Sequence, residues 1–202
     1  MPVGISCNCL PISDSMTEVV PGDCHVGRIP PSNDKIEGGA VMDDLTYMRQ
    51  ALELAQESAR EGEVPVGCVI VCNGQVVGKG RNRREQVKNA LSHAEVAAID
   101  EACRTLGGWR LWECTLYVTL EPCPMCAGAI VNARIPRVVY GASDGKYGAC
   151  GSVCDLFSMA FNHHPQVTSG VLAEECAGLM QEFFQNLRLE LRTRPKWKPR
   201  SH

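Results

Sequence analysis

Between residues 115 and 141 the sequence alternates between two kinds of hydrophobic pattern, and this alternation limits the possible folds more than any other feature. Residues 115–120 form a short apolar run typical of a buried strand, residues 123–132 carry a helical pattern, and residues 137–141 form a second apolar run. Two strands joined through a helix require a crossover, which makes them parallel neighbours. The segment therefore predicts an α/β layered fold with helices packed on a sheet.

Further elements flank this segment on both sides. An amphipathic helix is predicted from Asp44 onward, followed by a hairpin of two β-branched runs, residues 66–72 and 75–79. An Asn-Gly pair separates the two runs and favours a two-residue turn. Another helix is predicted over residues 93–106, and a last one, charged toward its end, over residues 172–192.

Composition divides the chain into one domain and two appendages. The length of 202 residues suits a single globular domain. Residues 1–41 contain five prolines, five glycines and no aromatic residue, so we expect residues 1–42 to be a disordered N-terminal extension. We expect residues 43–191 to form the domain and residues 192–202 to form a basic tail. Met42 directly precedes the first pattern and is a candidate for the start of translation.

The net charge of −3 conceals an uneven distribution. The last fifteen residues carry six basic side chains and one acidic side chain, a charge of +5, so the rest of the chain carries −8. A basic tail on an acidic body is typical of contact with phosphate groups. It is equally typical of a solvated terminus, and charge alone does not separate these interpretations.

The twelve cysteines do not indicate a disulfide framework, which is typical of short secreted chains that cannot build a core. Five of them lie in apolar stretches, where a free thiol packs as a small apolar group: Cys68, Cys72, Cys103, Cys114 and Cys176. No apolar run is long enough to span a membrane, and no secretion signal is recognisable. We therefore expect a cytoplasmic protein with reduced cysteines and no membrane partner.

Two short motifs stand at predicted helix starts and carry residue types that bind zinc. Cys123 and Cys126 are three residues apart, so both sulfurs face the same side of a first helical turn. The helix N-terminus favours the thiolate form that metal binding needs. His93 supplies a nitrogen ligand from the neighbouring helix. Three protein ligands leave a fourth tetrahedral position for water, which is typical of a catalytic zinc site.

Glu95 lies two residues after His93 and projects at a different angle, so it need not touch the metal. Its carboxylate can accept a proton from a water molecule at the open position. Each residue has a simpler interpretation when taken alone. Ser92 and Glu95 fit a capping box, a single histidine is more often structural, and one CxxC pair is more often a redox pair or half of a four-cysteine zinc site.

The combination of the motifs favours catalysis. HxE followed by PCxxC, with a strand between them, is the signature of zinc-dependent base deaminases. Residues 43–190 also resemble the bacterial tRNA-specific adenosine deaminases, which make inosine at the wobble position. Outside the zinc motifs the resemblance is carried by Asp144, Lys146 and residues 63–67, 119–122, 126–129, 134–135, 138–142, 148–149, 172–176 and 183–184.

The resemblance implies properties that spacing alone does not reveal. The implied fold is a three-layer α/β/α sandwich with a central five-stranded mixed sheet, as in the cytidine deaminases. The implied enzyme is a homodimer that binds a tRNA anticodon stem-loop. Each subunit holds one Zn²⁺ through His93, Cys123 and Cys126, and Glu95 is the catalytic residue.

The resemblance also implies contacts with the substrate. Asn82 hydrogen-bonds the flipped adenosine, and the backbone of Ala94 contacts the base. Four further residues border the anticodon loop: Asp144, Lys146, Phe184 and Arg188. Residues 1–42 and 157–165 depart from the family pattern and inherit no role.

Two alternatives stay open at this stage. Deaminases of a free base or nucleotide, such as guanine or deoxycytidylate, share both zinc motifs, although residues 141–149 and the basic C-terminal end favour the tRNA enzymes. A zinc-stabilised RNA-binding module without catalysis predicts a fourth protein ligand and no reaction.

Overall fold

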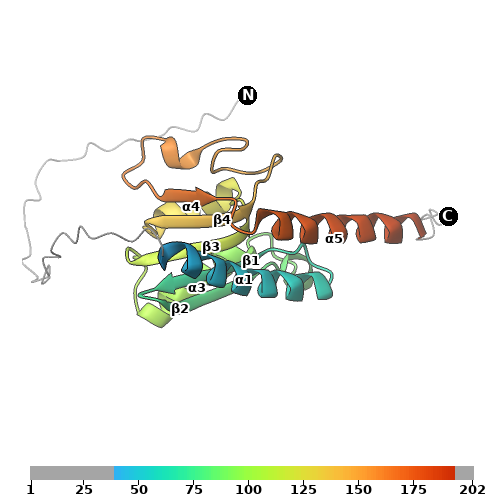
Figure 1. The fold of residues 1–202 in the computed structure, drawn as a ribbon, viewed down its shortest axis with the longest axis horizontal. Helices are drawn as coiled ribbons and strands as arrows, with labels where there is room; N and C mark the ends of the chain where they lie inside the picture. Colours follow the sequence, from blue (N-terminus) through green and yellow to red (C-terminus); the bar gives the residue numbers. More distant parts are fainter. Residues whose placement is uncertain (1–38, 194–202) are drawn as a thin grey trace, which may run out of the picture. The chain divides into compact units, whose positions relative to one another are not determined.

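A computed structural model of the chain describes residues 39–193 (Figure 1). The chain divides into two units, Met1–Lys35 and Ile36–His202, and all described residues belong to the second. Most of the expected N-terminal extension, residues 1–38, and most of the expected basic tail, residues 194–202, therefore lie outside the described residues.

A five-stranded mixed sheet forms the centre of the second unit, as expected. Its strands are β1 (Gly67–Cys72), β2 (Gln75–Arg81), β3 (Cys114–Leu120), β4 (Arg137–Ala142) and β5 (Gln166–Ser169). They lie in the order β2-β1-β3-β4-β5, with antiparallel pairing among β2, β1 and β3 and parallel pairing among β3, β4 and β5. The crossover predicted between residues 115 and 141 is therefore confirmed.

Helices cover both faces of the sheet and complete the expected three layers (Figure 1). The elements on one face are α1 (Gly39–Arg60) and α5 (Ala173–Thr193), and those on the other are α3 (Ala94–Leu106) and α4 (Pro124–Asn132). The strands alternate between the two cores, since Ile70 packs toward α3 and α4 whereas Val69 packs toward α1. Burial of both sheet faces explains why β1 and β3 read as continuous apolar runs.

Two glycines let the helices lie directly on the strands. A Cβ atom at Gly67 would lie 2.0 Å from the carbonyl oxygen of Ala51 in α1, and one at Gly80 would lie 2.0 Å from that of Ala94 in α3. No larger side chain fits at either position without displacing the helix. Gly80 therefore fixes the height of the first turn of α3 above β2.

The predicted turn signals are confirmed. Asn73 and Gly74 have φ angles of 49° and 78°, the left-handed pair that a two-residue hairpin turn requires. Gly107, with φ 68°, ends α3. Three details differ from the sequence-based expectation. The helix α1 begins at Gly39 rather than near Asp44, and a short helix α2 (Arg84–Val87) lies between the hairpin and α3, where no element was predicted. The strand β5 carries no apolar pattern because it is short and largely exposed.

The nine cysteines within residues 39–193 are free thiols. Cys68, Cys114 and Cys176 are buried, while Cys72 and Cys103 are half-buried against the core on the α3 side. Among the described helices, none combines the length and apolar character needed to cross a membrane.

A buried ion pair joins α1 to the sheet. Arg137 of β4 donates hydrogen bonds of 2.8 and 2.7 Å to the two carboxylate oxygens of Asp44, and the Tyr117 hydroxyl of β3 donates a third of 2.8 Å. The same guanidinium reaches the Thr168 hydroxyl of β5 at 3.3 Å. The carboxylate thus ties α1 to β3 and β4 with charge-assisted hydrogen bonds, and the guanidinium extends the network to β5.

Replacing this carboxylate, in Asp44→Asn, is expected to lower the free energy of unfolding at pH 7 by about 1.5–3 kcal/mol, since hydrogen bonds to a charged group are lost. Burial by itself raises the pKa of Asp44, but the hydrogen bonds from Arg137 and Tyr117 outweigh it and hold that pKa below its usual value. The contribution is therefore present above the unfolded-state pKa, about 3.9, and is lost as the pH falls through the lower folded-state pKa. Urea unfolding between pH 7 and pH 3 measures it.

The matched control is Asp100→Asn, which removes the exposed ion pair with Arg104 on the surface of α3. Its unfolding free energy should stay within about 0.5 kcal/mol of the wild type. Equal losses in the two variants, or a deficit of Asp44→Asn that is as large at pH 3 as at pH 7, would contradict this account of Asp44.

Candidate metal centre and substrate cavity

His93 and Cys123 occupy equivalent positions, because each is the residue that immediately precedes a helix. His93 precedes α3 with extended backbone angles, and Cys123 precedes α4 in the same way. Pro124 suits the first position of α4, where its fixed φ favours helix and its missing N–H costs nothing. Neither His93 nor Cys123 caps its helix with its side chain, so both side chains are available to a ligand.

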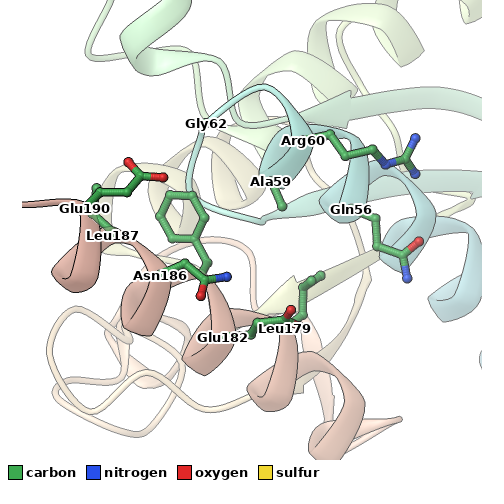
Figure 2. A pocket seen from close by; sticks show the side chains of 10 residues that line it. Gln56, Ala59, Arg60, Gly62, Leu179, Glu182, Asn186, Leu187 and Glu190 are labelled. Carbon is green, nitrogen blue, oxygen red and sulfur yellow. The ribbon is translucent and has the colours of Figure 1, made fainter.

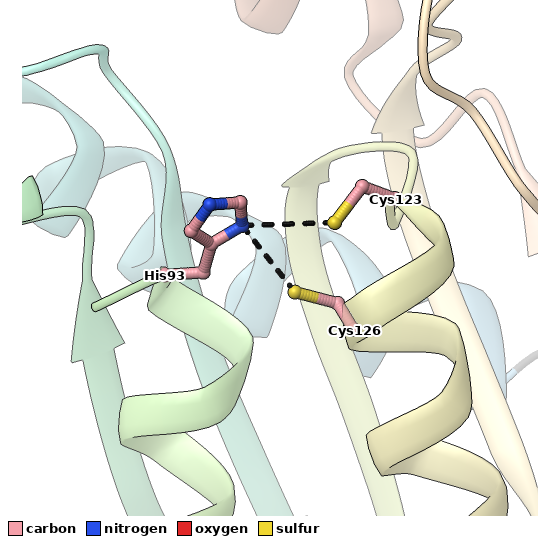
Figure 3. A group of neighbouring side chains, drawn as sticks. All are labelled: His93, Cys123 and Cys126. Carbon is pink, nitrogen blue, oxygen red and sulfur yellow. Dashed lines mark hydrogen bonds between the residues drawn. The ribbon is translucent and has the colours of Figure 1, made fainter. Parts of the chain in front are cut away.

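The three predicted ligands meet in space (Figure 3). His93 Nδ1 lies 3.7 Å from Cys123 Sγ and 3.5 Å from Cys126 Sγ, and all three atoms lie within 4.8 Å of one another. In a tetrahedral zinc site with Zn–S bonds of ≈ 2.3 Å and a Zn–N bond of ≈ 2.0–2.1 Å, each nitrogen–sulfur distance is about 3.6 Å. The donor set and its spacing therefore fit a zinc ion without rearrangement.

The charge state of the cluster is also suited to a cation. The hydrogen bond that Cys126 donates lowers the pKa of Cys123 to about 4, and His93 adds to this effect. That same hydrogen bond, together with burial, raises the pKa of Cys126, and the bond to Cys123 raises the pKa of His93. One thiolate is thus present already, held by two protons that a metal ion would displace.

Glu95 lies beside the cluster but outside it. Its side chain is 4% exposed and approaches Cys126, while the group of possible ligands within residues 39–193 comprises His93, Cys123 and Cys126. Burial raises the pKa of the Glu95 carboxyl. The capping-box interpretation is wrong, because the residue that precedes α3 is His93 and the Ser92 amide donates to the Asn89 carbonyl.

A cavity of ≈ 980 Å³ opens in front of the cluster. It is lined by His93, Glu95 and Cys123, and by five of the residues predicted to contact substrate: Asn82, Ala94, Asp144, Lys146 and Phe184. The predicted contact Arg188 does not line it. Arg188 lies in an adjoining hollow of ≈ 340 Å³ that shares Lys146 and Phe184 with the cavity.

The walls of the cavity combine apolar and polar groups. The apolar residues come from segments far apart in the sequence and include Val64, Val66, Leu120, Ala142 and Met180. Arg84 and Lys146, both exposed, supply cationic groups. A mostly apolar cavity with a few convergent polar groups and shifted pKa values is the usual form of a small-molecule site.

Glu121 was not predicted as a site residue, yet it organises one wall of the cavity. Its carboxylate is 2% exposed and accepts hydrogen bonds from the backbone amides of Asp144, Cys150 and Ser152, at 3.0–3.1 Å, and from the Ser152 hydroxyl. A Cβ atom at Gly148 would lie 2.4 Å from this carboxylate. One feature of the sequence indicates this role, because Glu121 is an acidic residue that stands directly between an apolar strand and Pro122.

A second hollow, of ≈ 620 Å³, lies between the end of α1 and the outer part of α5 (Figure 2). Arg60, Glu182 and Glu190 supply its charged groups, and Leu179 and Leu187 its apolar ones. None of its lining residues belongs to the His93, Cys123 and Cys126 cluster. The chemistry that the cluster can support therefore belongs to the larger cavity.

Comparison with known proteins agrees with this geometry. The sequence profile of the MafB19-like deaminases matches residues 42–188. The tRNA-specific adenosine deaminase of Bacillus subtilis is 49% identical over 146 residues, which cover 72% of this chain and 91% of that protein. The enzyme of the same name from Streptococcus pyogenes serotype M18 is 47% identical over 146 residues, which cover 71% of this chain and 92% of that protein.

A solved structure from a study of A-to-I editing by tRNA:A34 deaminases at the wobble position of transfer RNA matches as well. It is 44% identical, with a TM-score of 0.64, and the match covers 66% of this chain and 98% of that chain. The profile, the sequence identity and the shared fold each cover about two thirds or more of the chain. The protein belongs to the MafB19-like deaminases and to the family of tRNA-specific adenosine deaminases.

Proposed function

We propose that this protein catalyses the hydrolytic deamination of adenosine to inosine at the wobble position of a tRNA anticodon. The observation that carries the proposal is the buried Glu95 carboxylate, which faces the same cavity as the His93 and Cys123 side chains. The 49% identity to a tRNA-specific adenosine deaminase supports the substrate. Adenosine and water give inosine and ammonia, so the reaction needs no redox partner.

One zinc ion per subunit, held by His93, Cys123 and Cys126, is the metal that we propose for this site. The distances between the three donor atoms and the lowered pKa of Cys123 support this choice. When bound, zinc lowers the pKa of a coordinated water toward neutrality. With three protein ligands in the part of the chain that the structure describes, a fourth position stays free for that water.

Glu95 is the proposed catalytic residue. Its carboxylate accepts a proton from the attacking water and delivers it to N1 of the adenine ring. It then takes the remaining proton from the new C6 hydroxyl group and transfers it to the departing amine, so that the C6–N bond breaks and ammonia leaves. Burial supports this role, because a carboxyl with a raised pKa exchanges protons more readily near neutral pH.

The base is held by residues that line the cavity. Asn82 is proposed to hydrogen-bond the flipped adenosine, and the Ala94 backbone to contact its ring, while apolar walls such as Val66 and Phe184 exclude water. Flipping costs a few kcal/mol and is least costly in a single-stranded loop, which an anticodon provides.

The anticodon stem-loop is proposed to lie across the mouth of the cavity. Arg84 and Lys146 line the cavity and can hold loop phosphates, and Arg188 can extend this contact from the adjoining hollow. Asp144 and Phe184 would border the same loop. These residues together provide charged groups and apolar surface around the mouth of the cavity, although the net charge of the protein is negative.

Three further points stay proposals. Residues 43–191 are proposed to be the deaminase domain, with residues 1–42 and 192–202 outside it, and the profile match to residues 42–188 supports these limits. Assembly as a homodimer is proposed from the family resemblance. A cytoplasmic location is supported by the free cysteines of the described residues, which suit a reducing compartment.

Substitution of the proposed proton carrier, in Glu95→Gln, is expected to reduce inosine formation by about 10²- to 10⁴-fold, because the new amide cannot shuttle a proton. Zinc content should stay at one ion per subunit, since Glu95 lies outside the ligand group. Metal analysis and chromatography of digested anticodon stem-loop RNA measure the two quantities. The control is Glu113→Gln, because Glu113 is exposed and does not line the cavity. Loss of zinc, or unchanged turnover, would count against this role.

Substrate choice is tested by incubating the zinc-loaded protein separately with an anticodon stem-loop RNA, guanine and deoxycytidylate. Ammonia release is expected with the RNA, together with inosine at the wobble position. Release only from guanine or deoxycytidylate would assign the protein to free-base or nucleotide deamination instead. Stoichiometric RNA binding without ammonia from any of the three would favour the non-catalytic zinc module.

A further inference from the structure

Glu63 is a buried acidic residue that the proposed reaction does not use. Its side chain is 2% exposed and it does not line the cavity. One carboxylate oxygen, Oε2, accepts a hydrogen bond of 3.2 Å from the Asn82 side-chain amide. The other, Oε1, accepts one of 2.6 Å from the backbone amide of Gln86. A buried carboxylate is costly unless it is hydrogen-bonded, and these two donors satisfy it.

Asn82 is fixed at its backbone as well. Its N–H donates to the Val66 carbonyl at 3.0 Å, and its carbonyl accepts from the Ser58 hydroxyl at 3.0 Å. The residue is 5% exposed, yet it lines the cavity beside His93. The position of Asn82 is therefore set by the backbone, and the one freedom that remains is which end of its amide turns toward the cavity.

The contact with Glu63 removes that freedom. A carboxylate can only accept hydrogen bonds, so the amide nitrogen of Asn82 must face Glu63. The amide oxygen Oδ1 accepts no hydrogen bond from the described residues, and among them every fully buried polar side-chain atom has a partner. Oδ1 is therefore not fully buried, and because Asn82 lines the cavity we infer that Oδ1 faces it. It can accept a hydrogen bond from an N–H group of a base, such as an exocyclic amine.

We propose that Glu63 is a positioning residue that fixes the direction of the Asn82 amide and so determines which hydrogen-bonding atom Asn82 offers to the base. The inference rests on the proposed function and extends it, since it assigns part of the base selectivity to a side chain outside the cavity. An amide turned the other way would offer two N–H donors and would select against an amino group.

The bond to Gln86 extends the effect of Glu63. Gln86 belongs to α2, which also carries Arg84, a residue of the cavity wall. Oε1 and Oε2 each accept a hydrogen bond from a different donor. A glutamine at position 63 has only one side-chain oxygen, so it can accept from only one of these two donors. If its oxygen keeps the Gln86 amide, its nitrogen faces Asn82 and the Asn82 amide must turn over.

An exchange of the two functional groups separates positioning from simple stabilisation. The variants are Glu63→Gln, Asn82→Asp and the double variant E63Q/N82D, and the control is Glu53→Gln, an exposed glutamate of α1. In the double variant the new glutamine donates to the new aspartate and still accepts from the Gln86 amide, so every hydrogen bond is restored. The new aspartate also turns an acceptor oxygen toward the cavity, as the Asn82 amide does in the wild type.

Urea unfolding and kcat/KM are measured for the zinc-loaded proteins, on an anticodon stem-loop RNA and on any other substrate that the wild type deaminates. We expect both single variants to lose stability and the double variant to recover most of it. We expect kcat/KM to fall about 10- to 100-fold in Glu63→Gln, because the amide turns over, and to rise again in the double variant, because the acceptor is restored. Zinc content should stay unchanged throughout.

Recovery of stability in the double variant without recovery of kcat/KM would overturn the proposal, because the atom that position 82 offers to the base would then not matter. An unchanged kcat/KM in the folded Glu63→Gln protein would also overturn it, because Glu63 would then only stabilise the fold. Additive losses of stability in the two single variants would also overturn it, since Glu63 and Asn82 would then be uncoupled. If the wild type deaminates guanine or deoxycytidylate but not RNA, the proposed function fails. The role of Glu63 is then still tested, because stability and kcat/KM on that substrate can be compared among the same variants. If Asn82→Asp does not fold, comparison of Glu63→Gln with the double variant gives the same distinction.

Discussion

The close contact between α3 and the edge strand β2 is the constraint on which the site depends. Gly80 brings the first turn of α3 against the strand, so that a single Cβ atom there would collide with the Ala94 carbonyl. That turn contains Ala94 and Glu95, and His93 directly precedes it. The height of these residues above the sheet is therefore set by Gly80, which does not line the cavity. On the other side, β3 leads through two residues to Cys123 and α4. Parallel pairing of β3 with β4 fixes α4 on the same face as α3, and the two helix N-termini meet.

Much of this arrangement could be predicted from the sequence, and the reasons are local. The crossover, the Asn73-Gly74 turn and the end of α3 at Gly107 depend on hydrophobic period and on residues that tolerate positive φ, which a sequence displays directly. The strand β5 could not be found in this way, because it is short and its neighbours rather than its composition hold it. Five strands were expected only through the family resemblance.

The candidate site divides in the same manner. His93, Cys123 and Cys126 have side chains whose chemistry is distinctive at a given spacing, and the fold brings these three together. Glu63 and Glu121 gave no such signal, because their importance lies in backbone and side-chain donors that only the folded chain brings to them. Arg188 was expected to border the anticodon loop with Lys146 and Phe184. It lies one turn of α5 beyond Phe184 and lines the adjoining hollow rather than the cavity, so its contact with RNA stays a prediction.

Three buried glutamates surround the cavity, and their hydrogen-bond donors distinguish them. Burial by itself raises the pKa of Glu121, but the Ser152 hydroxyl and several backbone amides outweigh it and hold that pKa below its usual value, so Glu121 stays an anion that organises the loop. Glu63 is satisfied by Asn82 and Gln86. At Glu95 the balance is reversed, because burial raises its pKa and outweighs the opposing effects of one backbone hydrogen bond and the hydrogen bond with Cys126. The same side chain is thus a fixed acceptor at two positions and, at the third, a group that can both take up and release a proton.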